Sequence, residues 1–228
     1  MITIRTAGAL TVWVAVCALS ACGSPSSPKP SFSPSPAVST APVTDPAKAF
    51  LTVDQVNALV IGADPRATKV SGPEPLAHQP DRPYDGLAAS CGRALPLYFG
   101  AGEPPLRSYA KWTAAGQGNT FVNQLVAQYA DPTQASARFA ELTKDVPACA
   151  DATVANPDSG LAVKVAAVTA NSVQFQQGPG GTNRQLSGSH VANTEYRLLG
   201  NSIIGVSATQ PAAVVSTLAE ELGKNLAG

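Results

Sequence analysis

The chain has 228 residues, which is enough for one domain with accessory segments or for two small domains. Its 15 basic and 15 acidic side chains balance and form no basic patch, so the charge gives no reason to expect a nucleic-acid partner. None of the four cysteines has the Cys-x-x-Cys spacing, and both histidines are far from any cysteine in sequence, so a zinc site is not expected.

Residues 1–21 are predicted to be a lipoprotein signal peptide. A short positively charged head precedes an apolar core over residues 7–18, far shorter than the roughly 20 residues needed to span a bilayer. The core leads into Leu-Ser-Ala-Cys, ending at Cys22, which resembles the bacterial lipobox Leu-[Ala/Ser]-[Gly/Ala]-Cys. That resemblance implies cleavage between Ala21 and Cys22 and a lipid on the Cys22 thiol, which anchors the chain to the extracytoplasmic face of the cell membrane. The alternative is a conventional secretory signal in which Cys22 is incidental.

Residues 22–46 are predicted to be the lipidated cysteine followed by a disordered tether. The segment is rich in Ser, Pro, Ala and Thr and has almost no large apolar side chain, so it cannot bury enough surface to offset its ordering entropy. At about 3.1 Å per residue, a stretched tether would reach tens of ångströms from the membrane. A single folded domain is then predicted over residues 47–228.

The first helix of the domain carries a capping box made by Thr52 and Gln55, and Gly62 is expected to end it. Residues 67–87 contain four prolines and are predicted to be mostly loop. Strands are predicted over residues 95–99, 107–114 and 120–129. In the last of these strands, the polar Asn123 shares a face with Phe121, Leu125 and Tyr129.

A second helix is predicted to begin at Asp131 and Pro132, which suit the N-cap and the first helical position, and to end at Pro147. The elements expected after it are strands at 162–167, 172–176 and 184–186, a hairpin turn at 178–181, a hairpin of 195–199 with 202–208 around Gly200-Asn201, and a closing amphipathic helix from Pro211. Strands joined by tight turns favour an antiparallel sheet flanked by helices, an α+β fold.

Two cysteines remain in the mature chain once Cys17 is removed with the signal peptide and Cys22 is lipidated. Because the compartment is oxidising, a disulfide is predicted between Cys91 and Cys149. Closing a loop of about 59 residues contributes roughly 4 kcal/mol in the chain-entropy model. The alternative is two free thiols, one of them a nucleophile.

Three stretches of sequence, with Cys91 between the first two, are typical of one family. They read FLTVDQVNALVIGAD, FVNQLVAQYADPTQASARFAELTKDVPACA and YRLLGNSIIGVSAT. They resemble the PknH-type extracellular sensor domains, which lie outside actinobacterial receptor serine/threonine kinases and also occur alone as lipoproteins. The resemblance implies, over residues 47–228, a central antiparallel sheet flanked by helices with a cleft for an extracellular ligand. Family members typically carry a second disulfide, and this chain has Glu195 or Tyr196 near one of its positions and Thr209 at the other.

Catalytic patterns are weak, and enzyme activity is not predicted. Residues 187–190 read Ser-Gly-Ser-His, but they lack the Gly-x-Ser-x-Gly pattern of a nucleophile elbow, so a polar turn is the preferred interpretation. The loop carboxylates lack the spacing of a calcium loop. No cofactor and no metal are therefore expected.

The predicted function is that of a membrane-anchored extracytoplasmic lipoprotein whose sensor-like domain binds a small molecule, a lipid or a cell-wall fragment. The alternative is a protein–protein interaction module that docks an envelope protein or a receptor kinase. An antiparallel sheet often leaves one face available, so the candidate ligand contacts are aromatic and basic residues of the predicted sheet. They are Tyr98, Arg107, Tyr109, Lys111, Trp112, Tyr129 and Arg197. The alternative for the aromatic side chains is packing in the core.

Overall fold

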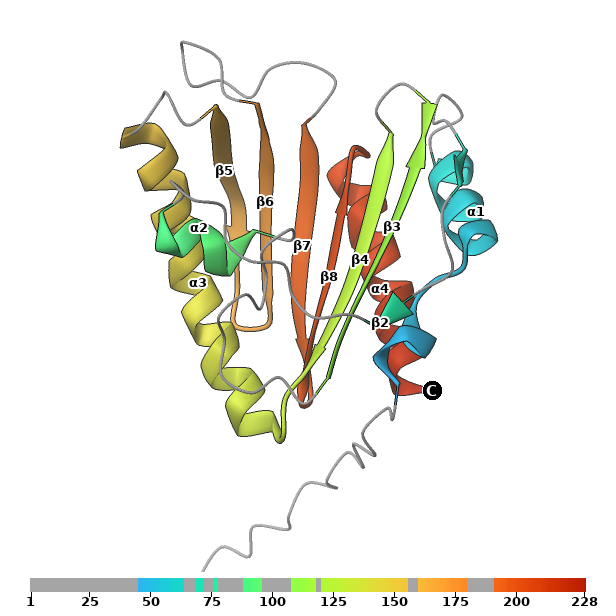
Figure 1. The fold of residues 1–228 in the computed structure, drawn as a ribbon, viewed down its shortest axis with the longest axis horizontal. Coiled ribbons are helices and arrows are strands. Elements are labelled where there is room, and N and C mark those ends of the chain that lie inside the picture. Colours follow the sequence, from blue (N-terminus) through green and yellow to red (C-terminus); the bar gives the residue numbers. More distant parts are fainter. Residues whose placement is uncertain are drawn as a thin grey trace, which may run out of the picture. The chain divides into compact units, whose positions relative to one another are not determined.

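An eight-stranded antiparallel sheet with helices on both sides forms the domain (Figure 1). This is the α+β fold that the sequence predicts. The computed structural model describes residues 45–63, 69–71, 76–77, 88–95, 108–117, 120–155, 160–179 and 191–228, all within one of the chain's two units, Ser39–Gly228. The predicted signal peptide, Cys22 and the predicted strand at 184–186 lie outside these residues.

The strands follow the order β1-β3-β4-β8-β7-β6-β5, and β2 also pairs with β3. Their bounds are β1 (Val70–Ser71), β2 (Leu76–Ala77), β3 (Ser108–Gly116), β4 (Phe121–Gln128), β5 (Leu161–Val168), β6 (Ser172–Pro179), β7 (Ala192–Leu199) and β8 (Ser202–Ala208). The helices are the 3-10 helix η1 (Pro46–Ala49), α1 (Val53–Ala63), α2 (Ala89–Ala94), α3 (Pro132–Ala155) and α4 (Ala212–Ala227).

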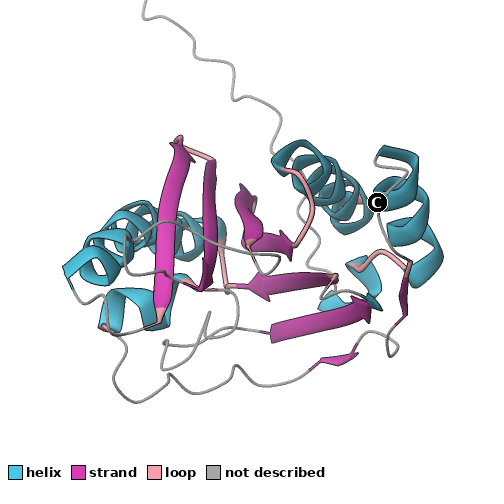
Figure 2. Cartoon of the chain, turned by 90° about the horizontal axis from the view of Figure 1, so that it is seen from above, coloured by secondary structure: helices cyan, strands magenta, loops and turns pink. Residues whose placement is uncertain are grey.

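Alternate residues of the central strands point to opposite faces and so build two separate cores. On the α4 face, β3, β4 and β8 pack against η1, α1 and α4 through residues that include Val122, Val126, Ile204, Val206 and Leu218. On the α3 face, β4 to β8 pack against α2 and α3 through residues that include Leu125, Phe139, Leu142, Phe175 and Tyr196. Figure 2 shows the matching arrangement, with one group of helices to each side of the strands and the C-terminus in the right-hand group.

The capping box at the start of α1 is confirmed. The backbone N–H of Thr52 donates to Gln55 Oε1 over 2.9 Å, and the N–H of Gln55 donates to Thr52 Oγ1 over 3.3 Å. The predicted end of this helix was wrong, because α1 continues through Gly62 to Ala63. Gly62 is not among the described glycines with positive φ, so it does not adopt the left-handed conformation that ends many helices.

The predicted start of the second long helix is confirmed, and its predicted end was wrong. Asp131 Oδ1 accepts the backbone N–H of Gln134 over 2.9 Å, as an N-cap residue does. The helix α3 then continues through Pro147 to Ala155. A proline inside a helix costs about 3 kcal/mol, but Cys149 and Thr153 are buried beyond it and offset that cost.

The strand β6 pairs with β5 and β7, so the predicted hairpin of 172–176 with 184–186 was wrong. Gly178 and Pro179 are strand residues opposite Ala162 and Leu161 rather than turn residues. The tight turn precedes β6 instead, where Thr169 Oγ1 accepts the backbone N–H of Ser172 over 2.8 Å. The hairpin of β7 with β8 turns at Gly200, whose φ is 57°, as predicted.

The segment around Cys91 forms the short helix α2, which was not among the predicted elements. Of the predicted strand at 95–99, Leu95 is the C-cap of α2, and residues 96–99 lie outside the described part of the chain, so the strand stays a prediction. Within the predicted loop of residues 67–87, β1 and β2 add two short strands along β3.

The N-terminal segment is held on the α4 face by the side-chain amide of Gln124. Gln124 Oε1 accepts the backbone N–H of Leu51 over 2.9 Å, and Gln124 Nε2 donates to the carbonyl of Leu51 over 3.0 Å. Asn57 pairs in the same way with the N–H and carbonyl of Val70, over 2.8 and 3.0 Å. In each case, one amide side chain satisfies the N–H and the carbonyl of a single residue, Leu51 between η1 and α1 or Val70 in the short strand β1.

The ring of Tyr196 packs directly on the backbone of Gly205 across β7 and β8. A Cβ on Gly205 would lie 2.7 Å from two ring carbons of Tyr196 and 2.9 Å from Leu125 Cγ. The Tyr196 hydroxyl donates to the carbonyl of Ala94 over 2.8 Å, which ties the end of α2 to the sheet. Gly205 therefore leaves the space that this large buried ring occupies.

Replacing Gln124 with alanine should destabilise the fold by about 2 to 4 kcal/mol, because the N–H and carbonyl of Leu51 would stay buried without partners. The measurement is urea unfolding of wild type and Gln124→Ala. The matched control is Gln134→Ala on the exposed side of α3, which should change the unfolding free energy by less than about 0.5 kcal/mol. Equal stabilities of the two variants would show that the amide does not hold the segment.

Replacing Gly205 with alanine should destabilise the fold by about 1 to 3 kcal/mol or more, because the new methyl group overlaps Tyr196 and Leu125. The control is Gly62→Ala, where nothing lies within 4 Å of the added Cβ, and helix propensity predicts a gain of about 0.5 to 1 kcal/mol. Thermal unfolding of both variants would test whether Gly205→Ala lowers the stability and Gly62→Ala raises it. A stable Gly205→Ala variant would contradict the close packing.

Candidate functional site

Of the seven residues predicted as ligand contacts, the three whose side chains the structure describes, Tyr109, Tyr129 and Arg197, do not lie on one face of the sheet. Tyr109 and Tyr129 are 7% and 4% exposed and belong to the core of the α3 face. Arg197 lies on the opposite face, since its register partner is Ile204 of the α4 core. Tyr98 and Arg107 lie outside the described residues, as do the side chains of Lys111 and Trp112, whose backbones pair with Leu125 and Gln124.

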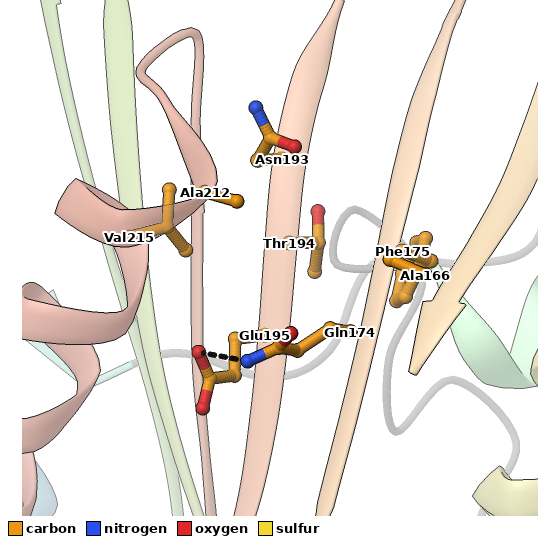
Figure 3. Close-up of a pocket in the computed structure, with 8 residues that line it drawn as sticks. All are labelled: Ala166, Gln174, Phe175, Asn193, Thr194, Glu195, Ala212 and Val215. Atoms are coloured by element: carbon orange, nitrogen blue, oxygen red, sulfur yellow. Dashed lines mark hydrogen bonds between the residues drawn. The ribbon is translucent and has the colours of Figure 1, made fainter. Parts of the chain in front are cut away.

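A small cavity lies between β6, β7 and the start of α4 (Figure 3). Its volume is about 10 Å³, which is close to the space that one water molecule needs. The lining residues are Ala166, Gln174, Phe175, Asn193, Thr194, Glu195, Ala212 and Val215. A cavity of this size does not admit a metabolite, a lipid chain or a sugar.

Glu195 lines that cavity, and its carboxylate accepts several hydrogen bonds on the α4 face. It is 2% exposed, and it accepts hydrogen bonds from Ser216 Oγ over 2.6 Å, Arg197 Nε over 2.6 Å and Gln174 Nε2 over 3.1 Å. Arg197 also donates to the Ser216 carbonyl over 3.1 Å. Both oxygens of the carboxylate are therefore used within the protein, and the cluster docks α4 on β6 and β7.

A second charged cluster joins α2 to α3 beside the disulfide. Arg93 donates to both oxygens of Asp145, over 2.6 and 2.9 Å, and Arg138 contacts the same carboxylate over 3.4 Å. Arg138 also donates to the Arg93 carbonyl over 2.6 Å. The structure joins Cys91 and Cys149 in a disulfide, with their Cα atoms 4.7 Å apart. Covalent and ionic links thus hold the same two helices together.

Burial perturbs the hydroxyl of Tyr196, which lies under α2. Desolvation raises the pKa of Tyr196 well above its ordinary value, the nearby Tyr109 adds to the rise, and the guanidinium of Arg138 opposes it. The phenol thus stays protonated as the donor to Ala94, which is a structural role.

A row of uncharged polar side chains crosses the α3 face. Register places Thr113, Asn123, Ser207 and Thr194 side by side on β3, β4, β8 and β7. Thr194 Oγ1 donates to Ser207 Oγ over 2.9 Å, and Gln177 Nε2 donates to the same oxygen over 3.3 Å. We call these five residues the polar row.

Asn123 is the unusual member of the polar row. Its Oδ1 atom is buried and accepts no hydrogen bond. Buried acceptors normally have a partner, so an unpaired one in a sheet calls for an explanation. In Figure 1, α2 and α3 lie beside β5 and β6, and no described helix lies over the upper part of β4 on this side. The polar row is therefore the candidate functional site.

Asn123 is recognisable in the sequence as a polar residue on a largely apolar strand face, but it is not among the predicted ligand contacts. The signal that would have found the site is the same departure from alternation on other strands, at Ser207 and Thr194. Those residues come together only when β4, β8 and β7 are paired, across more than 70 residues of chain.

Metal and membrane-spanning features are not found in the part of the chain that the structure describes. No group of three or more His, Cys, Asp or Glu side chains among those residues could hold a metal ion. No described helix combines the length and the apolar character needed to cross a membrane.

No protein-family model and no curated protein matches the sequence. Among solved structures, the extracellular domain of PknH from Mycobacterium tuberculosis is similar, with a TM-score of 0.57 and 15% sequence identity. The similarity covers 78% of this chain and 92% of that domain. At this identity the comparison shows a shared fold, which is that of the extracellular domain of PknH.

Stability should fall at high pH through Tyr196. The folded chain keeps the phenol proton above the ordinary pKa near 10, where the unfolded chain releases it, so stability is lost as the pH rises through that value. Tyr196→Phe should be less stable than wild type by about 1 kcal/mol at about pH 8, because it loses the hydrogen bond to Ala94. The difference should shrink by about pH 11, since phenylalanine carries no proton. Urea unfolding at both pH values tests this, and a constant difference would contradict it.

Proposed function

We propose that the chain is a membrane-anchored extracytoplasmic lipoprotein whose domain binds a ligand as a sensor domain does. Three features support the proposal. The fold is similar to that of the extracellular domain of PknH, the disulfide suits an oxidising compartment, and the sequence ending at Cys22 resembles a lipobox. The lipid on Cys22 would hold the domain at the membrane through the Ser/Pro-rich tether.

The polar row is the single observation that carries the binding role. An isolated structural domain gains nothing from a buried acceptor without a partner, whereas a binding site uses such an atom when the ligand arrives. The ligand is proposed to be a small molecule, a lipid or a cell-wall fragment. The proposed role is binding rather than catalysis, because Glu195 and Asp145, the buried carboxylates described, are committed to ion pairs inside the fold.

Docking of an envelope protein or a receptor kinase is the competing function. A thermal-shift screen of envelope metabolites combined with crosslinking in intact cells separates the two. Stabilisation by a metabolite supports the proposal. Recovery of one stoichiometric protein partner, with no metabolite effect, would favour docking.

Lipid anchoring predicts different results for the two N-terminal cysteines. Cys22→Ala should move the protein from the membrane fraction to the soluble or secreted fraction, because the acylated thiol is lost. Cys17→Ala is the matched control and should stay in the membrane fraction, because Cys17 lies in the segment predicted to be removed. Detergent phase partitioning with immunoblotting measures both. A Cys22→Ala protein that remains in the membrane fraction would contradict a lipid anchor.

A further inference from the structure

We infer that the polar row binds a neutral, hydroxyl-rich ligand, such as a cell-wall glycan presents, and that Asn123 and Ser207 receive one of its hydroxyl groups. The inference rests on the proposed function and deepens it, because it assigns the place and the chemistry of binding. Its basis is the hydrogen-bonding state of two residues that face each other across β4 and β8.

Asn123 supplies the acceptor. Its Oδ1 atom is buried without a partner, whereas Gln124, the next residue, uses both ends of its amide on Leu51. Strand alternation puts these two amides on opposite faces. The amide on the α4 face is fully paired, and the amide on the α3 face keeps an open acceptor.

Ser207 supplies the donor. Its Oγ atom already accepts hydrogen bonds from Thr194 Oγ1 and Gln177 Nε2, over 2.9 and 3.3 Å. A hydroxyl has one hydrogen and two lone pairs, so these two bonds fill the acceptor sites and leave the Ser207 hydrogen to donate. The side chains of Thr194 and Gln177 thereby set the direction of that hydrogen.

A ligand hydroxyl fits this pair because it can donate to Asn123 Oδ1 and accept from Ser207 Oγ at the same time. Directly opposite side chains in an antiparallel pair have Cβ atoms about 4.5 to 5.5 Å apart, which is a span that one bridging oxygen can cover. An ammonium group can only donate and a carboxylate can only accept, so neither satisfies both residues.

The surroundings agree with a neutral ligand. None of the five residues of the polar row is charged. Thr113 is exposed, Asn123 and Gln177 are half-buried, and Ser207 and Thr194 are buried at 1% and 2% exposure. Phe121 is also half-buried and lies two residues before Asn123 on the same strand face. Its ring offers an apolar surface beside the polar row, and a pyranose presents both hydroxyl groups and an apolar ring face.

The test is a titration of the full mature chain with three probes, followed by heteronuclear NMR and calorimetry. The probes are neutral chitotetraose, anionic tetragalacturonate and vesicles of phosphatidylglycerol. Saturable binding of chitotetraose alone is expected. Asn123→Ala should weaken it at least tenfold, and Asn225→Ala, an exposed asparagine on α4, should leave it unchanged.

The melting temperature of Asn123→Ala distinguishes the inference from a structural role for this side chain. Asn123→Ala removes an unpaired buried acceptor, so its melting temperature should equal or exceed that of wild type. A melting temperature lower by more than about 5 °C would overturn the inference, because the side chain would then be holding the fold.

The remaining outcomes separate this inference from the proposed function. Equal binding of chitotetraose by wild type and Asn123→Ala would overturn the assigned site. Binding of tetragalacturonate or vesicles alone would contradict a neutral ligand but would remain compatible with the proposed function. Binding of no probe would overturn the inference, and a water molecule would then satisfy Asn123 and Ser207. The proposed function would in that case be tested by the metabolite screen and the crosslinking alone.

Discussion

The pairing of β4 with β8 is the constraint on which the rest of the domain depends. Seven residue pairs, from Val122 opposite Ala208 to Gln128 opposite Ser202, join the β3–β4 hairpin to the meander of β5 to β8. Alternate residues of both strands enter the α4 core and the α3 core. A shift of one residue would exchange the two faces and bury the wrong side chains under both helix layers. The packing of both helix layers therefore depends on this register.

Local signals in the sequence predicted much of this arrangement. The capping box of Thr52 and Gln55, the N-cap at Asp131 and the turn at Gly200 each depend on contacts within a few residues, and each is confirmed. Tight turns between strands also favoured an antiparallel sheet with helices, which is the observed fold. Such elements are predictable because the chain segment that forms them also supplies their hydrogen-bond partners.

The errors arose where distant contacts outweighed a local preference. Pro147 was expected to end a helix, but Asp145 and Cys149 on either side of it bind α2 through an ion pair and a disulfide across more than 50 residues. Arg197 stays a predicted ligand contact, and the structure adds that its guanidinium donates to Glu195 on the same strand face. For the candidate site, Asn123 could be recognised as a polar interruption, but its lack of a partner depends on β8, about 80 residues away.

The strand β4 finally links the two properties that matter for the proposed function. On one face, Gln124 holds Leu51, close to the point where the predicted tether begins, and on the other face Asn123 contributes to the polar row. The amide on the side of Leu51 is therefore fully paired within the fold, while the amide on the opposite side retains an open acceptor. A disordered tether of the kind predicted for residues 22–46 would transmit little orientation to the membrane. Under the proposed function, this arrangement would suit a domain that captures and presents a ligand better than one that passes a rigid conformational signal along its own chain.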